Sequence, residues 1–276
     1  MKKRTIISLI VAAALILGGG ILAAFGFYMA GEEAFVPSLT EREVPVRETF
    51  ESVVIETEDC EVNFTPFNGD ADPYIVFSER EKVSHHTSVQ GGVLKVNMTD
   101  HRQWLDYIGF GVGSMKMTVY LPLKQYKSLR VTTDTGDIKV PEVFSAKEIW
   151  LDSDTGDIHC EAKAKSLVDC ATDTGDITVK NCAPATLRLQ TDTGDVKLHM
   201  ISGTEIHLET DTGNVNAEDV YCTVFACESD TGDVQIRDSD ANLINIKTST
   251  GNICVPEAWQ RKNCHTETET GKIRFE

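Results

Sequence analysis

Apolar residues recur in a fixed rhythm through the C-terminal half of the chain. From residue 129 onward they stand in pairs two positions apart, and polar or charged residues separate them. This alternation predicts β-strands with one buried face. Each set of pairs surrounds a D-T-G-D-like motif, and the motif glycines are 19 or 20 residues apart. These glycines are Gly136, Gly156, Gly175, Gly194, Gly213, Gly232, Gly251 and Gly271.

With the glycine as position 0, the apolar pairs occupy positions −7 and −5 before it and +2 and +4 after it. Of these 32 places 31 are apolar, Thr266 being the exception. One coil of about nineteen residues cannot bury its own apolar row, whereas stacked coils bury a continuous one. The pattern therefore predicts an all-β fold, a single-chain β-solenoid over residues 129–276. Its eight rungs of about 4.8 Å would span about 34 Å, and a glycine with positive φ would reset the strand parity at each turn.

An earlier segment shows the same spacing without the motif. Val53, Ile55, Val62 and Phe64 stand at the equivalent positions around Cys60, which predicts a degenerate coil at 50–65. Further strands are predicted at Tyr74–Phe77, Val93–Met98 and Met117–Leu121. We expect residues 44–128 to form an irregular N-terminal β portion that covers the open end of the solenoid.

The N-terminus has the pattern of a membrane anchor. Residues 6–29 carry no charge and follow a basic tip in residues 1–5. A helix of this length crosses a bilayer, and the basic tip predicts a cytoplasmic N-terminus. Residues 30–43 would be a linker, and the rest of the chain would be extracytoplasmic. The alternative is a signal peptide cleaved after Ala30, but Tyr28 at −3 and the long apolar run favour an uncleaved anchor.

The composition and net charge of the chain exclude some classes of binding partner. The 276 residues are 41% hydrophobic and 25% charged, as in a globular protein. Lys and Arg number 26 against 43 Asp and Glu, so the net charge is −17. This charge repels nucleic acids and anionic lipid surfaces, and we expect no nucleic-acid partner.

Aspartates form two columns in the repeat. Position −2 holds Asp134, Asp154, Asp173, Asp192, Asp211 and Asp230, and position +1 holds Asp137, Asp157, Asp176, Asp195 and Asp233. Stacked carboxylates about 4.8 Å apart repel each other by about 0.9 kcal/mol even in water. Each Asp could accept a backbone N–H in its own turn, an interpretation favoured by the uncharged substitutes Asn214, Ser249 and Asn252. The alternative is Ca²⁺ held by Asp154, Asp157, Asp173, Asp176, Asp192 and Asp195; no other cofactor is expected.

The eight cysteines do not form a recognisable disulfide framework. Cys160, Cys170, Cys227 and Cys264 occupy inward positions, where a thiol behaves as a small apolar group. Cys160 and Cys170 are the one pair that adjacent coils could bring together. We therefore expect mostly free, buried thiols. There is no C-x-x-C motif, so a zinc site is not expected.

No motif for catalysis is present. The chain lacks G-x-S-x-G, a P-loop and a dinucleotide-binding G-x-G-x-x-G. Paired carboxylates are abundant, but they repeat in every coil. We predict that the protein is not an enzyme; a glycan-cleaving β-helix is the enzymatic alternative.

Three stretches resemble a bacterial cell-envelope family known as putative adhesins, β-strand-repeat domains of unknown function that include LiaG-like membrane proteins. They are F-E-S-V-V-I-E-T-E-D-C-E-V at 50–62, V-Y-L-P at 119–122 and S-L-R-V-T-T-D-T-G-D-I at 128–138, followed by the later coils. The resemblance covers roughly residues 50–276. It implies a membrane-tethered extracytoplasmic solenoid linked to envelope stress, and it implies no catalytic residues.

These observations together predict a single-pass protein of the cell membrane that presents an acidic solenoid as a non-catalytic interaction surface. The partner would be an envelope protein or a cell-wall glycan, with residues 6–29 in the membrane. The alternative of a self-associating structural scaffold stays open beside the enzymatic one.

Overall fold

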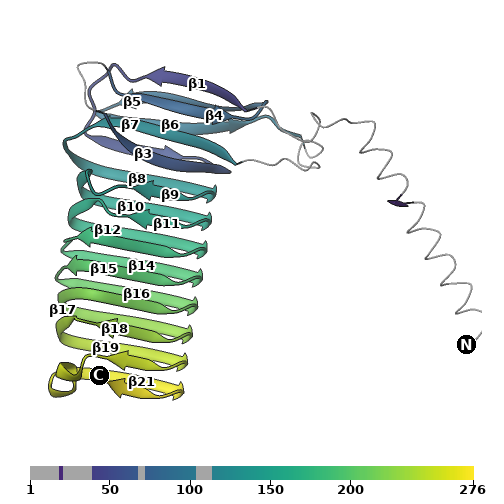
Figure 1. Cartoon of the computed structure of the whole chain (residues 1–276). Coiled ribbons are helices and arrows are strands. Elements are labelled where there is room, and N and C mark those ends of the chain that lie inside the picture. Colours follow the sequence, from purple (N-terminus) through teal and green to yellow (C-terminus); the bar gives the residue numbers. More distant parts are fainter. Residues whose placement is uncertain (1–18, 21–38, 68–71, 104–113) are drawn as a thin grey trace, which may run out of the picture. The chain divides into compact units, whose positions relative to one another are not determined.

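The computed structural model describes residues 19–20, 39–67, 72–103 and 114–276 (Figure 1). Residues 40–101 and 114–276 form one compact unit. The predicted membrane helix at 6–29 lies outside the described residues except for Gly19 and Gly20, and it stays a prediction. Among the described residues, no helix combines the length and apolar content needed to span a membrane.

Each regular coil consists of a long strand, a turn at the D-T-G-D motif and a short strand (Figure 1). The long strands are β8 (Gln125–Thr135), β10 (Ser145–Thr155), β12 (Lys163–Thr174), β14 (Thr186–Thr193), β16 (Glu205–Thr212), the second half of β17 (Val215–Thr231), β19 (Asp240–Thr250) and β21 (Asn263–Thr270). The short strands are β9 (Ile138–Val140), β11 (Ile158–Cys160), β13 (Ile177–Cys182), β15 (Val196–Ser202), the first half of β17, β18 (Val234–Arg237), β20 (Ile253–Val255) and β22 (Ile273–Phe275).

Successive coils are parallel and in register. Ile177 pairs with Ile158 on one side and with Val196 on the other, so position +2 forms one continuous ladder. All three side chains are fully buried. The predicted β-solenoid of nineteen-residue coils is confirmed, and its core is the shared apolar interior between the long-strand and short-strand sheets.

The segment 50–65 lies directly against the first regular coil. β2 (Ser52–Glu56) pairs with β8, with Val53 opposite Leu129. β3 (Cys60–Phe67) pairs with β9, with Val62 opposite Ile138. The degenerate coil is therefore in the predicted phase, and the residues between it and β8 are placed elsewhere in the fold.

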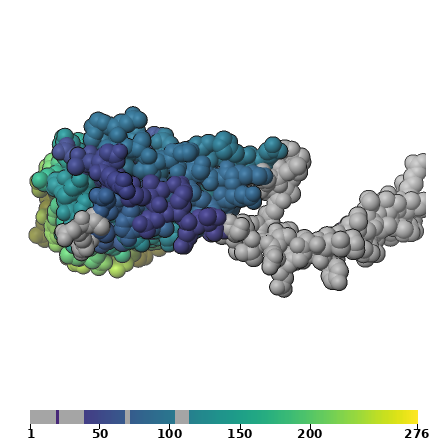
Figure 2. Space-filling model, turned by 90° about the horizontal axis from the view of Figure 1, so that it is seen from above, coloured from purple at the N-terminus to yellow at the C-terminus, as the bar shows by residue number. Residues whose placement is uncertain are grey.

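Those intervening residues cover the N-terminal end of the stack. They form β4 (Tyr74–Glu79), β5 (Val83–Gln90), β6 (Val93–Asp100) and β7 (Met115–Pro122), and β1 (Thr40–Pro45) joins them. β6 and β7 continue the parallel stack on β2 and β3, whereas β5, β4 and β1 add antiparallel strands beyond them. Figure 2 shows these purple and blue residues in front of the green coils. The reversal of strand direction ends the stack of parallel coils at this end.

The corner that follows the short strand has left-handed backbone geometry in four successive coils. Asn181, Met200 and Asp219 have φ of 55°, and Asp238 has φ of 47°. Asn and Asp tolerate this region better than other non-glycine residues. Met200 is the exception, and its side chain is 55% exposed.

The last coils enclose one large aromatic side chain. A 3₁₀ helix, η3 (Glu257–Arg261), follows β20 and places Trp259 fully inside. The Trp259 ring lies 5.8 Å from the Phe225 ring, and its Nε1 donates a hydrogen bond of 3.0 Å to the carbonyl of Ser239. This side chain fills the interior near the C-terminal end.

Candidate functional site: turn columns, cap network and surface hollows

The aspartates at position +1 connect neighbouring coils. Oδ1 of Asp157 accepts the backbone N–H of Asp176 at 2.8 Å, and Oδ1 of Asp176 accepts that of Asp195 at 2.9 Å. The same bond runs from Asp137 to the last coil, with Asn214 and Asn252 as uncharged members. The sequence interpretation is therefore corrected in one respect: each side chain caps the turn of the next coil and not its own.

Lysine side chains offset part of the negative charge of the aspartates at position +1. Lys197 Nζ lies 2.6 Å from Asp176 Oδ2 and 3.6 Å from Asp195 Oδ2. Partial burial opposes ionisation of Asp176, but hydrogen bonds from Lys197 and from the Asp195 N–H outweigh it, so the pKa of Asp176 is lowered. The same hydrogen bond raises the pKa of Lys197. Repulsion within the column is thus offset by backbone N–H groups and by ammonium groups.

The motif glycine is required because successive coils approach closely. A Cβ atom at Gly194 would lie 1.9 Å from the carbonyl oxygen of Gly175, and one at Gly213 would lie 1.8 Å from that of Gly194. We expected a positive φ at each turn. Gly175, Gly232 and Gly251 have the expected positive φ, at 155–157°, a region that L side chains rarely adopt. Close approach requires glycine in all eight coils, and positive φ adds to that requirement in these three.

A buried hydroxyl column at position −3 was missed by the sequence analysis. Thr191 Oγ1 donates to the carbonyl of Gly175 at 3.0 Å, and the same bond recurs along the stack. The other donors to a motif glycine are Ser153, Thr172, Thr210, Thr248 and Thr268. Ser229 occupies the same position, but its buried Oγ has no partner. The available clue was that position −3 is Thr or Ser in all eight coils.

The six aspartates considered for calcium fall into the two columns. Asp154, Asp173 and Asp192 at position −2 are exposed, whereas Asp157, Asp176 and Asp195 at position +1 are half-buried and bonded as described above. In the part of the chain that the structure describes, no three His, Cys, Asp or Glu side chains are grouped to hold a metal ion. Calcium binding stays the alternative to turn capping, and a melting experiment can test it.

All eight cysteines are free thiols, and five of them are buried. A hydrogen bond with Cys160 and burial raise the pKa of the Cys170 thiol. The two residues that the sequence analysis singled out as a pair thus interact as thiols. Thiols held neutral by burial are poor nucleophiles and poor metal ligands.

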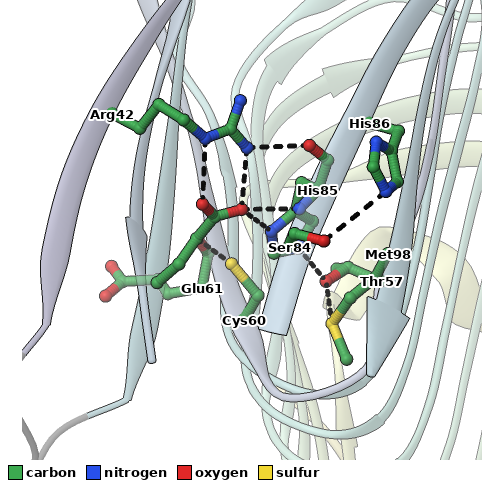
Figure 3. Close-up of polar contacts among 9 residues, drawn as sticks. Arg42, Thr57, Cys60, Glu61, Ser84, His85, His86 and Met98 are labelled. Carbon is green, nitrogen blue, oxygen red and sulfur yellow. Dashed lines mark hydrogen bonds and ion pairs between the residues drawn. The ribbon is translucent and has the colours of Figure 1, made fainter. Parts of the chain in front are cut away.

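The cap contains a buried polar network that departs from the repeat (Figure 3). His85 Nδ1 lies 2.9 Å from Glu79 Oε1, and His85 Nε2 lies 2.8 Å from Thr57 Oγ1. Arg42 holds both carboxylate oxygens of Glu79, at 3.0 and 3.1 Å, and donates to the carbonyl of His85 at 2.7 Å. The network thus joins β1, β4, β5 and the segment after β2.

Burial and charge determine the protonation states in this network. Desolvation lowers the pKa of His85 and outweighs the opposing effect of Glu79. Burial alone would raise the pKa of Glu79, but hydrogen bonds from Arg42 and His85 lower it overall. An ionised Glu79 accepting from Nδ1–H leaves Nε2 of a neutral His85 to accept the Thr57 hydroxyl.

This order of hydroxyl, imidazole and carboxylate resembles a hydrolase triad. Thr57 is 6% exposed and His85 is 1% exposed, however, so neither reaches solvent to meet a substrate. The Phe77 ring stacks on the His85 ring at 5.1 Å, and the Arg42 guanidinium lies 4.8 Å from the centre of the Phe77 ring. The arrangement connects the strands of the cap and has no access for acyl transfer.

Two carboxylates on the long-strand sheet have raised pKa values. Burial, together with Asp154 and Asp173, raises the pKa of Asp152, and burial raises that of Asp169. Asp169 lines a hollow of about 420 Å³ on this sheet, but Asp152 does not. A carboxylate pair that cleaves glycans must face one cleft; Asp152 lies outside this hollow, whose other carboxylates are Glu209 and Glu228.

Three further hollows lie on the short-strand sheet, with volumes of about 330, 500 and 220 Å³. Gln235 lines all three, and Arg237 lines the first two. The outward side chains of β15, β17, β18 and β20 supply most of their walls.

The chain is similar to one known family and to several solved structures. The family model described as Toastrack DUF4097 matches residues 50–208 and 161–276. A putative adhesin from Bacteroides fragilis NCTC 9343 is 17% identical with a TM-score of 0.49, and 87% of this chain and 99% of that chain are covered. A putative adhesin from Parabacteroides merdae ATCC 43184 is 13% identical with a TM-score of 0.49, with coverage of 87% and 97%.

A putative lipid binding protein from Parabacteroides distasonis ATCC 8503 is 16% identical with a TM-score of 0.47, with coverage of 87% and 96%. No curated protein matches the chain. These likenesses do not establish a shared ligand.

Proposed function

Because the chain belongs to the Toastrack DUF4097 family, we propose that it is a membrane-anchored, extracytoplasmic protein that presents its solenoid as a non-catalytic interaction surface in the bacterial cell envelope. The uncharged run at 6–29 after a basic tip supports the anchor and its orientation. A link to the envelope-stress response rests on the family resemblance alone.

One observation carries the proposal. The polar groups that could do chemistry together, Thr57, His85 and Glu79, are enclosed in the cap. The exposed polar side chains instead stand in columns on a stack whose turns are hydrogen-bonded from coil to coil. A surface of this kind is preorganised for binding, because little side-chain or loop ordering remains to oppose association.

Two measurements test the proposal. In intact cells, a C-terminal tag should be cleaved by added protease, and an N-terminal tag should be cleaved only after permeabilisation. A column bearing the detergent-solubilised chain should then retain more of one defined envelope protein or polymer than a column bearing the heat-denatured chain. Equal retention on both columns, or a C-terminal tag protected in intact cells, would contradict it.

The same preparation discriminates the alternatives. A glycan-cleaving enzyme would release reducing ends or unsaturated sugars from envelope polymers during the incubation. A self-associating scaffold would sediment with a mass that rises with protein concentration.

A further inference from the structure

The three hollows of the short-strand sheet form one continuous feature, which we name the short-strand groove. Its shared wall is Gln235, and Arg237, Cys254 and Glu276 each line two of the hollows. The groove follows the stacking direction from Lys180 toward the C-terminal residue Glu276. It therefore crosses several coils, as a site for an extended ligand would.

The residue at position +3, three after each motif glycine, faces outward, and in four successive coils it lines the groove. Lys197 is followed by the uncharged residues Asn216, Gln235 and Cys254 in the next three coils. The amides of Asn216 and Gln235 therefore place uncharged hydrogen-bonding groups between the charged side chains that line the groove.

The two planar polar groups at the centre of the groove, the Arg237 guanidinium and the Gln235 amide, are hydrogen-bonded to each other. Arg237 Nη2 donates a hydrogen bond of 2.6 Å to Gln235 Oε1. Ser239 Oγ donates at 2.6 Å to the carbonyl of Arg237 and so fixes the end of β18. The Gln235 amide keeps both N–H donors for a ligand, because its oxygen is the atom used by Arg237.

The charges along the groove balance. The cationic lining residues are Lys180, Lys197, Arg237 and Arg274, and the anionic ones are Glu218, Asp233, Asp238 and Glu276. Balanced, interspersed charges provide donors and acceptors without a net field that would select an anion or a cation. This balance favours an uncharged ligand rich in hydroxyl groups.

An aromatic ring lines the hollow with the largest volume of the three. Tyr221 lines the 500 Å³ hollow and is 51% exposed. A tyrosine ring offers apolar contact area with a polar tip, which suits the C–H face of a sugar ring. The 420 Å³ hollow on the long-strand sheet has no Phe, Tyr or Trp among its lining residues, so the two sheets differ in this respect.

From these features we propose that the short-strand groove binds a linear neutral glycan, with Tyr221 stacking on a sugar ring and Gln235 and Arg237 bonding to its hydroxyl groups. The inference rests on the proposed function, because it names the ligand class of that interaction surface.

The test uses the detergent-solubilised full chain on an array of cello-, chito- and xylo-oligosaccharides, with polyuronic oligosaccharides as charged comparators. The variants Tyr221→Ala and Arg237→Ala alter exposed side chains of the groove. Gln190→Ala removes an exposed polar group from the opposite sheet and is the matched control. Thermal melts of all four proteins verify that each is folded.

We expect the wild type and Gln190→Ala to bind one neutral series equally, and each groove variant to bind it at least about tenfold more weakly. Binding to charged oligosaccharides alone, or groove variants that bind like the wild type, would overturn the inference. Retention of an envelope protein without any glycan binding would overturn it as well but leave the proposed function standing. Failure to retain any envelope component would count against both.

Discussion

Replacing Gly194 by alanine tests whether coil-to-coil contact at the motif glycine holds the solenoid together. The added Cβ would lie 1.9 Å from the carbonyl oxygen of Gly175 and 2.5 Å from its carbonyl carbon. Ordinary C···O contacts are about 3.3 Å or longer. The turns of the two coils must therefore separate by about 1.4 Å, because the obstacle is backbone and not the end of a flexible side chain.

Four hydrogen bonds cross this junction beside the turn. Two join backbone atoms, and two use the side chains of the −3 and +1 columns. They run from Gly175 N to Thr193 O, Ile177 N to Asp195 O, Thr191 Oγ1 to Gly175 O and Asp195 N to Asp176 Oδ1, at 2.9–3.0 Å. Each contributes about 1 kcal/mol net. Loss of all four predicts that the free energy of unfolding falls by about 4 kcal/mol.

Urea denaturation followed by circular dichroism measures this change. Hydrogen exchange adds a local readout, since unfolding of stacked repeats need not be two-state. Amides of the coils around Gly175 and Gly194 should lose protection first. The matched control is Gln190→Ala, an exposed position on the same coil, with an expected change within about 0.5 kcal/mol. If Gly194→Ala unfolded within that same margin of the wild type, the close-approach explanation would be wrong.

Four further predictions follow from the same geometry. Thr191→Val should lower the free energy of unfolding by about 1–2 kcal/mol, because a buried carbonyl loses its donor, whereas Thr191→Ser should not; equal urea midpoints for the two would contradict this. Met200→Asn should raise it by about 1 kcal/mol, because φ of 55° suits Asn better, and an unchanged or lower melting temperature would refute it. Burial lowers the pKa of His85, so the stability linked to this group is complete above about pH 6.5 and declines as the pH falls through the lowered value; His85→Gln should flatten the decline in urea midpoint from about pH 7 to 5, and an equally steep decline in the variant would argue against it. The lowered pKa of Glu79 adds a second loss below about pH 4.5, which His85→Gln should retain. Melts with calcium and with chelator should coincide, because the position +1 carboxylates already accept N–H groups; a higher melting temperature with calcium would revive the metal site.

The repeat was readable from the sequence because every coil has the same environment. Ile158, Ile177 and Val196 are apolar for one shared reason, contact with their equivalents above and below. The degenerate coil also has apolar residues at these positions, and Val53 and Val62 lie in the expected register. The long stretch of sequence between the degenerate coil and Gly136 hides the direct pairing of β2 with β8 and of β3 with β9. The strands β4 to β7, which come between them in the sequence, lie on the other side of the degenerate coil.

The network in the cap could not be predicted in the same way. Arg42, Thr57, Glu79 and His85 come from separate segments, and neither periodicity nor spacing relates them. Their contacts depend on antiparallel pairings such as β1 with β4, which the local pattern does not specify. The groove around Gln235 was missed for a related reason: it arises from outward side chains, on which core packing places no constraint.

Because each rung bonds in the same way to the rung on either side, duplication or loss of one nineteen-residue unit would leave the cap unaltered and change the rod by about 4.8 Å. Copy number would then determine the distance between the cap and the last coil of such a protein. Relatives with more or fewer units would differ in reach and keep the same cross-section.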